Sequence, residues 1–190
     1  MIVKPIMSYR NERGTIMDFL ELAKRRFSER RFDERTVEPE KLERILEAGR
    51  VAPTAHNYQP QHFYLIRSKE AREKLKSVTQ FHYNVPLMIL VCYDENTAWK
   101  SLEETVLTNY NSGEQDATIA ATSMMFAAEE LDVHTIWVRG FDSGAVRKTF
   151  GLPDHMIPVM MLGLGYPTER SKPSALHEQR KPLAEFCTEL

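Results

Sequence analysis

Cysteine is scarce in this sequence, and its scarcity argues against a fold held together by disulfides. Only two of the 190 residues are cysteines: Cys92 lies inside an apolar run and Cys187 lies close to the C-terminus. Two thiols so far apart in the sequence are weak evidence for a bridge. We therefore expect both to be free, as in proteins of a reducing compartment, and predict a cytoplasmic location.

Long apolar runs and an excess of one charge are also lacking. No run reaches the roughly eighteen apolar residues that a membrane-spanning helix needs, and the first residues lack the apolar core of a secretory signal. With 25 basic and 27 acidic residues the net charge is -2, which provides no general attraction for nucleic acid or an anionic membrane. We predict neither partner, and any anion site must be local.

Several motifs that mark other classes of protein are absent as well. No G-x-G-x-x-G follows an expected strand, which disfavours a Rossmann nucleotide-binding domain. The six histidines form no metal-ligand pattern and there is no C-x-x-C, so we predict no metal site. The sequence shows no repeat and no Gly/Ser-rich linker. We expect a single domain over residues 1–190, in which residues 1–14 form an extended or poorly ordered arm.

Hydrophobic periodicity predicts strands interleaved with helices. An apolar repeat in residues 16–23, followed by the basic stretch 24–26, indicates a first helix whose last turn is cationic. Residues 116–131 are apolar over most of the helix circumference, which is typical of a helix at the centre of a core or an interface. Further helices are expected at 40–51, 71–77 and 144–150, and strands at 62–66, 87–93, 134–138 and 157–164. This order indicates an α/β or α+β fold.

The segment Arg26-Phe27-Ser28-Glu29-Arg30 carries the first chemical signal. Two guanidinium groups and a hydroxyl within five residues suit a phosphate monoester, because arginine presents a planar fork of donors and serine adds a short neutral one. The neighbouring basic residues leave two other interpretations open. The stretch could be a nucleic-acid patch, or a solvated helix end.

The stretch 52–60, APTAHNYQP, carries the second signal. Two prolines stiffen its backbone, and the amides of Asn57 and Gln59 offer both donors and acceptors to the edge of a heterocycle. The stretch could therefore recognise a pyrimidine-like ring. An ordinary turn between a helix and a strand has the same composition.

Taken together, the motifs resemble those of the nitroreductase family. R-x-S-x-R at 26–30 and APTAHNYQP at 52–60 are similar in order and spacing to two family segments, and VRGFD at 138–142 is similar to a family turn. GLGYP at 163–167 and RKPL at 180–183 resemble its closing motifs. The resemblance covers residues 17–186.

The resemblance implies a fold and a function. The expected fold is α+β, an α/β/α sandwich around a mainly antiparallel sheet, in an intertwined homodimer that binds one FMN at each of two interface sites. The expected activity is that of an FMN-dependent oxidoreductase, with NAD(P)H as co-substrate. It would pass two electrons by a ping-pong mechanism to a small electron-poor acceptor such as a nitroaromatic or a quinone.

The resemblance also implies roles for single residues. The FMN phosphate and ribityl end would be held by the first basic segment and the tail, through Arg26, Phe27, Ser28, Arg30, Arg180 and Lys181. The flavin ring would be lined from the partner subunit by Pro53, Thr54, Ala55 and Asn57. Gly140 would lie against the ring, with Arg139 either at the flavin edge or turned to solvent. No catalytic side chain is expected, because the flavin carries the redox chemistry.

Acceptor contacts are expected from three aromatic residues: Trp99, Tyr110 and Phe141. The alternative for the first two is a surface helix in which Trp99, Leu102, Val106 and Tyr110 pack inward or against the partner. Two alternative functions also stay open. One keeps the fold and flavin but changes the reaction to reductive dehalogenation, enone reduction or flavin destruction. The other is a non-catalytic protein that binds FMN or, through residues 24–31, RNA.

Overall fold

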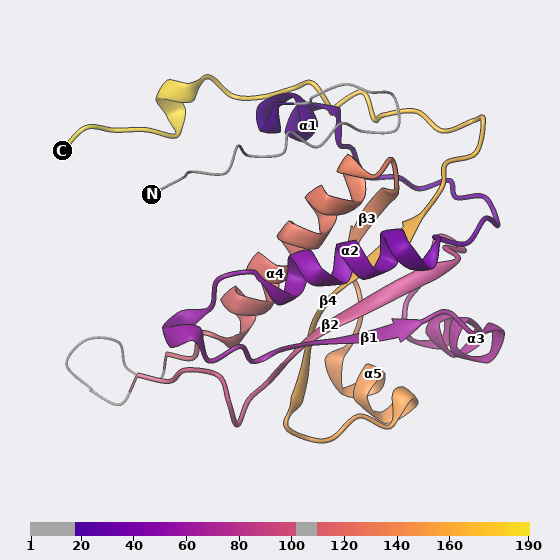
Figure 1. Ribbon diagram of the computed structural model, residues 1–190, viewed down its shortest axis with the longest axis vertical. Coiled ribbons are helices and arrows are strands. Elements are labelled where there is room, and N and C mark those ends of the chain that lie inside the picture. Colours follow the sequence, from indigo (N-terminus) through magenta and orange to yellow (C-terminus); the bar gives the residue numbers. More distant parts are fainter. Residues whose placement is uncertain (1–17, 102–109) are drawn as a thin grey trace, which may run out of the picture.

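The computed structural model describes residues 18–101 and 110–190, so the predicted arm of residues 1–14 lies outside the described residues. The predicted helices and strands are present, with ends shifted by no more than three residues (Figure 1). The helices are α1 (Phe19–Arg25), α2 (Pro39–Arg50), α3 (Lys69–Val78), α4 (Gly113–Glu130) and α5 (Ser143–Phe150), with short 3₁₀ turns η1 (Ala55–Asn57) and η2 (Leu183–Glu185). The strands are β1 (Gln61–Ile66), β2 (Leu87–Asp94), β3 (His134–Val138) and β4 (Met156–Gly165).

The four strands form one antiparallel sheet in the order β1-β2-β4-β3. A single row of partners runs across it, from Tyr64 to Leu90, then to Met161 and Val138. The predicted α+β class with an antiparallel sheet is confirmed. Strands β1 and β3 are the two edges, and the longer β2 and β4 occupy the centre.

Both faces of the sheet are covered, which explains why the sequence of β2 is apolar without alternation. Leu87, Ile89 and Val91 belong to the core that contains residues of α2 and α4. Met88 and Cys92 point to the opposite core, which contains residues of α3 and α5. Helices α2 and α4 therefore lie on one face and α3 and α5 on the other (Figure 1), and the predicted three-layer sandwich is confirmed.

Helix α4 is the central helix of the molecule, as its apolar circumference predicts. It contacts α1, α2 and all four strands, and Ala117, Ala121 and Met124 are fully buried. Small side chains let other elements come close. On α2, a Cβ at Gly49 would lie only 2.8 Å from Met124 Cγ, so the packing of α2 on α4 depends on the glycine.

Helix α1 buries a different face from the expected one. The predicted stripe included Phe19 and Leu20, but these side chains are 64 % and 58 % exposed, and the buried residue of α1 is Leu22. Phe19 makes an edge contact with the Phe126 ring at 5.1 Å between centroids. Phe19 therefore lies at the boundary between α4 and solvent in a single chain.

Three predictions from composition can be compared with the described residues. Both cysteines are free, as expected, with Cys92 buried and Cys187 exposed. Within the described ranges, no helix combines the length and apolar character that a membrane crossing requires. In the same ranges, no three His, Cys, Asp or Glu side chains are grouped so that they could hold a metal ion.

Candidate functional site

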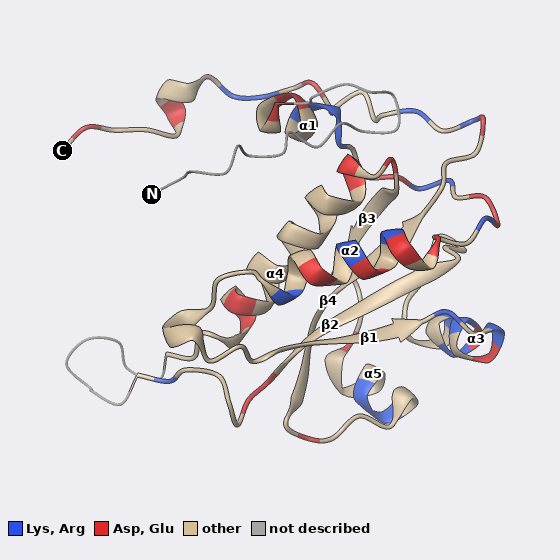
Figure 2. Cartoon of the chain, in the orientation of Figure 1, with Lys and Arg blue, Asp and Glu red and all other residues tan. Residues whose placement is uncertain are grey.

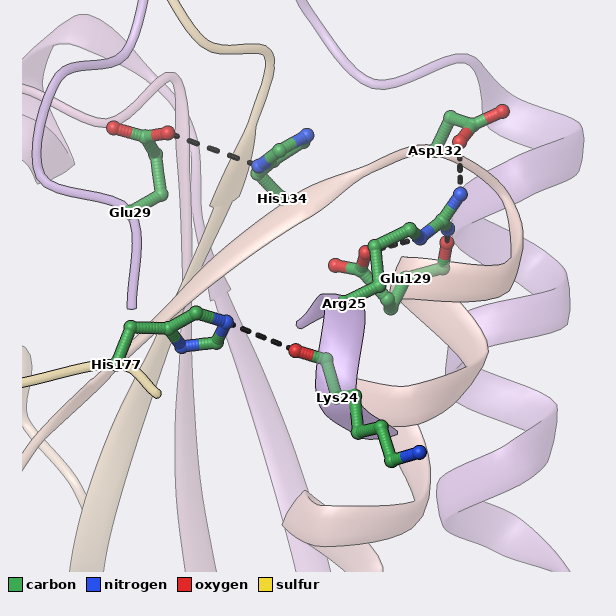
Figure 3. A network of polar contacts seen from close by, with 7 residues as sticks. All are labelled: Lys24, Arg25, Glu29, Glu129, Asp132, His134 and His177. Carbon is green, nitrogen blue, oxygen red and sulfur yellow. Dashed lines mark hydrogen bonds and ion pairs between the residues drawn. The ribbon is translucent and has the colours of Figure 1, made fainter. Parts of the chain in front are cut away.

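The segment that follows α1 lies beside the tail that follows β4, so residues from the two ends of the chain share one surface. Thr168 N donates to Arg31 O and Asp33 N to Tyr166 O, both at 2.9 Å. Further along the tail, the His177 ring bonds to Lys24 O through Nε2, also at 2.9 Å (Figure 3). Figure 2 shows that basic residues of both segments gather at this end of the molecule.

Arg26, one of the predicted phosphate ligands, is under the charge of another, Arg180. Burial lowers the pKa of Arg26, Glu129 opposes that effect, and the positive charge of Arg180 lowers the pKa further. A second positive charge acting on a half-buried arginine favours an anion beside that arginine. The fold thus places Arg180 near enough for its charge to act on Arg26, although the two are far apart in the sequence.

A groove of about 580 Å³ opens between the segment after α1 and the tail. Its lining includes the predicted Ser28 and Arg30, and Arg30 Nη1 donates to Ser28 O at 3.0 Å. Arg31, next to Arg30 in the sequence, also lines the groove, and the tail contributes Lys172 and Ser174. Guanidinium forks, an ammonium group and two hydroxyls form a donor set that suits a phosphate.

Arg25 differs from Arg26 because its guanidinium forms ion pairs within the fold. Its Nε lies 2.7 Å from Glu129 Oε1 and its Nη1 lies 3.0 Å from Asp132 Oδ1 (Figure 3). These contacts fasten α1 to the C-terminal end of α4. Asp132 has a left-handed backbone (φ 56°), which aspartate adopts more readily than most residues.

The other two residues predicted at this end make contacts within the chain. The Phe27 ring packs edge-on against His134, at 5.4 Å, and against His177, at 6.0 Å. Lys181 forms an exposed ion pair with Glu185 at 3.1 Å. Phe27 therefore helps to seat the tail on β3, and Lys181 lies in the exposed part of the tail.

The predicted ring-lining loop connects α2 to β1 and has an unusual backbone. His56, Asn57 and Gln59 have φ values of 51°, 57° and 52°, a left-handed region that side chains other than glycine rarely adopt. Thr54 holds the loop in this shape, since its Oγ1 accepts from Gln59 N at 3.1 Å and its carbonyl accepts from Asn57 N at 3.0 Å. Such strain often marks a functional loop.

Asp116 anchors the same loop, although sequence reasoning assigned it no role. Its carboxylate is 3 % exposed and accepts from Ala55 N at 3.0 Å and from Ser112 Oγ at 2.8 Å. The available signal was a single acid near the start of an otherwise apolar helix. Because a buried carboxylate needs partners, that signal could have pointed to an anchoring contact.

Two of the three aromatic residues predicted to contact the acceptor lie beside this loop. The rings of His56 and Trp99 stack at 5.2 Å with an angle of 19°, and Trp99 contacts Tyr110 at 5.7 Å. The alternative surface helix is wrong for Trp99 and Tyr110, which lie outside any helix beside the bridge between Lys100 and Asn111. Residues 102 and 106 of that alternative fall outside the described residues.

Arg139, Gly140 and Phe141 form a separate group after β3. A Cβ at Gly140 would lie 2.4 Å from a ring carbon of Phe81, and Gly140 O accepts from Thr79 Oγ1 at 2.8 Å. Within the chain, Arg139 is exposed and its guanidinium lies over the Phe141 ring at 5.2 Å. Of the two orientations expected for Arg139, the single chain has the one turned to solvent.

The predicted phosphate residues and the predicted ring-lining loop lie at opposite ends of α4. Glu129, whose charge acts on Arg26, and Asp116, which binds the loop, are thirteen residues apart, or about 20 Å along a helix. One chain therefore does not bring the two groups together. The resemblance assigned them to different subunits.

Comparison with known proteins places this geometry in context. The chain is 32 % identical over 160 residues to a Methanothermobacter thermautotrophicus protein named as an NADH dehydrogenase/NAD(P)H nitroreductase, which covers 80 % of this chain and 79 % of that one. It is similar to the structure of a nitroreductase family protein from Clostridium difficile 630, with 36 % identity, a TM-score of 0.82, and 90 % and 98 % of the two chains covered.

A third similarity concerns the fold alone. The structure resembles a protein from Exiguobacterium sibiricum 255-15 solved in complex with FMN, with 22 % identity, a TM-score of 0.75, and 93 % and 99 % of the chains covered. Residues 23–80 and 79–166 match the nitroreductase family, which is more than half of the chain. The predicted family is confirmed, and this chain belongs to the nitroreductase family.

Proposed function

We propose that this member of an oxidoreductase family binds FMN and transfers two electrons from NAD(P)H to a small electron-poor acceptor. The observation that carries the proposal is the groove between the segment after α1 and the tail, which Ser28, Arg30, Arg31 and Lys172 line. The charge of Arg180, from the same tail, also acts on Arg26. The FMN in the Exiguobacterium sibiricum structure supports the choice of flavin.

The donor set fits the terminal phosphate of FMN. Arg26 is half-buried and under the charge of Arg180, so a dianion would relieve both the desolvation and the repulsion. Arg30 and Ser28 line the open side of the groove. We assign the phosphate to these four residues, with Phe27 and Lys181 beside them.

The ring end of the flavin would be lined by Pro53, Thr54, Ala55 and Asn57 of a second copy of the chain. The loop is preformed, since Asp116 and Thr54 hold it by hydrogen bonds, and preformed sites bind at a lower entropic cost. Gly140, with Arg139 beside it, would face the ring from the first chain. His134, which contacts Phe27, marks the phosphate end of β3, and Gly140 follows the other end of that strand. His134 and Arg139 are five residues apart along an extended strand, or about 17 Å, so the separation of Gly140 from the phosphate end is compatible with one bound FMN.

The protein's part in the chemistry is to bind, orient and exclude water. When bound, the flavin supplies the redox chemistry by taking two electrons from NAD(P)H and giving them to the acceptor in a separate step, which is a ping-pong order. The residues proposed here supply positive charge at the phosphate end of the flavin and a preformed, rigid loop at its ring end. No side chain is assigned as a catalytic acid or base.

Acceptor choice is proposed to depend on aromatic side chains near the ring. Trp99, stacked on His56, and Tyr110 next to it form a cluster at the edge of the ring-lining loop. Phe141 lies beyond Gly140, with Arg139 over it. Aromatic faces favour a flat aromatic or quinonoid acceptor by stacking.

A homodimer is part of this proposal, since each cofactor would need both chains. Several large apolar side chains are exposed in the single chain: Phe19, Leu20, Ile119, Leu176, Leu183 and Phe186. Exposed apolar side chains near one another are typical of surfaces that another protein covers. Those of α1 and α4 would meet the second copy, and the tail would lie across it.

Purification tests the proposed function. The chain should elute as a yellow protein with one flavin per subunit, and NAD(P)H should bleach it in the absence of oxygen. A screen of acceptors by stopped-flow reoxidation would then separate nitroaromatic or quinone reduction from dehalogenation, enone reduction or flavin destruction. A colourless protein that retains nucleic acid at low salt would instead support the RNA-binding alternative and contradict the proposal.

A further inference from the structure

Glu29 lies in the middle of the predicted phosphate segment and has no role in the function proposed above. Glu29 is only 1 % exposed, although it lines the groove together with Ser28, Arg30 and Arg31. A buried carboxylate is costly unless its oxygens are hydrogen-bonded. The contacts of Glu29 therefore indicate what it does.

Both carboxylate oxygens of Glu29 are bonded. Oε1 accepts from the backbone N–H groups of Arg30, at 2.8 Å, and Arg31, at 2.7 Å. Oε2 accepts from Ser171 Oγ in the tail. One side chain thus holds two consecutive amides of the segment and one hydroxyl of the tail.

The surroundings of Glu29 fix it to the edge of the sheet as well. Its backbone N–H donates to Thr135 O on β3 at 2.9 Å. His134 Nδ1, on the same strand, lies 3.7 Å from Oε2, which is beyond hydrogen-bond length (Figure 3). The segment, the tail and β3 therefore converge on a single residue.

This arrangement has a consequence for anion binding. The amides of Arg30 and Arg31 are occupied by Glu29, so they cannot cradle a phosphate, and binding falls to side chains. The direction of those side chains depends on the backbone that Glu29 holds. The tail is held in the same way, since Arg31 Nη1 also donates to Arg170 O at 2.9 Å.

We infer that Glu29 is a positioning residue for the phosphate site. Its buried carboxylate joins residues 28–31 to the tail and so presents arginines of both segments to one phosphate. The inference rests on the proposed function, because the phosphate is that of FMN. Glu29 borders the groove, but its carboxylate oxygens are occupied, so it acts through the backbone of Arg30 and Arg31 and through Ser171.

The test compares ligands with and without the phosphate. Glu29→Ala removes all three bonds, Ser171→Ala removes only the bond to the tail, and Glu34→Ala, at an exposed position of the same connection, is the matched control. FMN and riboflavin affinities are measured by flavin fluorescence. Exchange of the Arg30 and Arg31 amides is followed by NMR on the same proteins without flavin.

We expect Glu29→Ala to weaken FMN binding about tenfold or more while riboflavin binding changes by less than about twofold. The Arg30 and Arg31 amides should exchange faster in the same variant. Ser171→Ala should weaken FMN binding by a smaller factor and leave those amides protected, which keeps the test valid if Glu29→Ala folds poorly. Glu34→Ala should match the wild type in every measurement.

Unchanged FMN affinity in both Glu29→Ala and Ser171→Ala would overturn the inference, whatever the amides do. An equal loss of FMN and riboflavin affinity would also overturn it, because the effect would then not be specific to the phosphate. A wild-type chain that binds no FMN would refute the proposed function and with it the positioning role. The two failures are therefore distinguishable.

Discussion

At the residue scale, the neighbouring residues Arg25 and Arg26 have different roles. Arg25 is paired with Glu129 and Asp132, whereas the charges that act on Arg26 include the repulsive one of Arg180. The charge of Glu129 acts on both arginines, but Arg25 is ion-paired with it, whereas Arg26 is half-buried and also under the weaker, repulsive charge of Arg180. Of the two, Arg26 is therefore the one suited to bind an anionic ligand.

Substitution of Arg25 should therefore mainly lower stability, whereas substitution of Arg26 should mainly lower flavin binding. Arg25→Ala leaves the buried Glu129 carboxylate without its partner, so we expect the free energy of unfolding to fall by about 2–3 kcal/mol. Arg26→Ala with Arg30→Ala should abolish flavin retention while the free energy of unfolding changes little. Urea unfolding and flavin content after gel filtration measure both. Full flavin content in the double variant would refute the phosphate assignment.

Cys92 provides a pH dependence whose sign can be worked out. Burial raises the pKa of its thiol from 9.0 to about 12, so between these values the unfolded chain loses a proton that the folded chain keeps. Its contribution to stability is complete below pH 9 and is lost as the pH rises toward 12. From pH 8 to pH 10 this contribution should fall by about 1.4 kcal/mol.

The measurement for Cys92 is a comparison of denaturant unfolding at pH 8 and pH 10 in the wild type and in Cys92→Ala. The variant should lose less stability over this range, because it lacks the thiol. Cys187, which is exposed, gives the control variant Cys187→Ala, which should behave as the wild type. Equal losses in wild type and Cys92→Ala would contradict the assignment.

At the element scale, α4 organises the molecule because its two ends hold two different pieces of the proposed site. Its N-terminal end binds the ring-lining loop through Asp116, and its C-terminal end receives α1 through Arg25. A helix that is buried along most of its length keeps these pieces at a fixed separation. The loop and the basic segment can therefore be perturbed separately.

Loss of the Asp116 anchor should affect the ring end alone. Asp116→Ala leaves Ala55 N and Ser112 Oγ without their acceptor, at a cost of about 1–3 kcal/mol in the free energy of unfolding. We expect FMN and riboflavin affinities to fall by the same factor, since in the proposed site the loop would contact the ring they share. A loss confined to FMN would contradict the assignment of this loop to the ring.

The elements were predictable to different degrees, for physical reasons. Strand β2 and helix α4 have periodic apolar patterns that local sequence displays directly. The buried face of α1 and the non-helical setting of Trp99 were not predicted, because distant partners decide them. Likewise, no sequence pattern links Glu29 to Ser171, since the two are far apart in the chain and meet only in the fold.

At the scale of the whole molecule, a single chain presents two halves of a site that do not meet. The motifs of the sequence predicted both halves, and in the fold the charge of Arg180 acts on Arg26. The distance along α4 separates them from the loop of residues 53–57. We propose that a second copy of the chain supplies the missing half.

A charge in the proposed interface should therefore separate the subunits. Phe19 and Leu20 are largely exposed in the single chain, so Phe19→Glu should give a particle with the mass of one chain, 22.0 kDa, that retains no flavin. Analytical ultracentrifugation measures the mass. Lys74→Glu, on the exposed surface of α3, is the control and should remain a yellow dimer. A monomeric wild type that holds flavin would contradict the dimer.

The most direct test of the divided site combines two defective chains. Arg26→Ala with Arg30→Ala carries a defect in the phosphate half, and Asp116→Ala carries one in the ring half. Co-expressed with different tags and purified as heterodimers, they should bind one FMN per dimer, because one of the two sites then contains neither defect. Heterodimers without FMN would show that each site is built within a single chain, and would contradict the account.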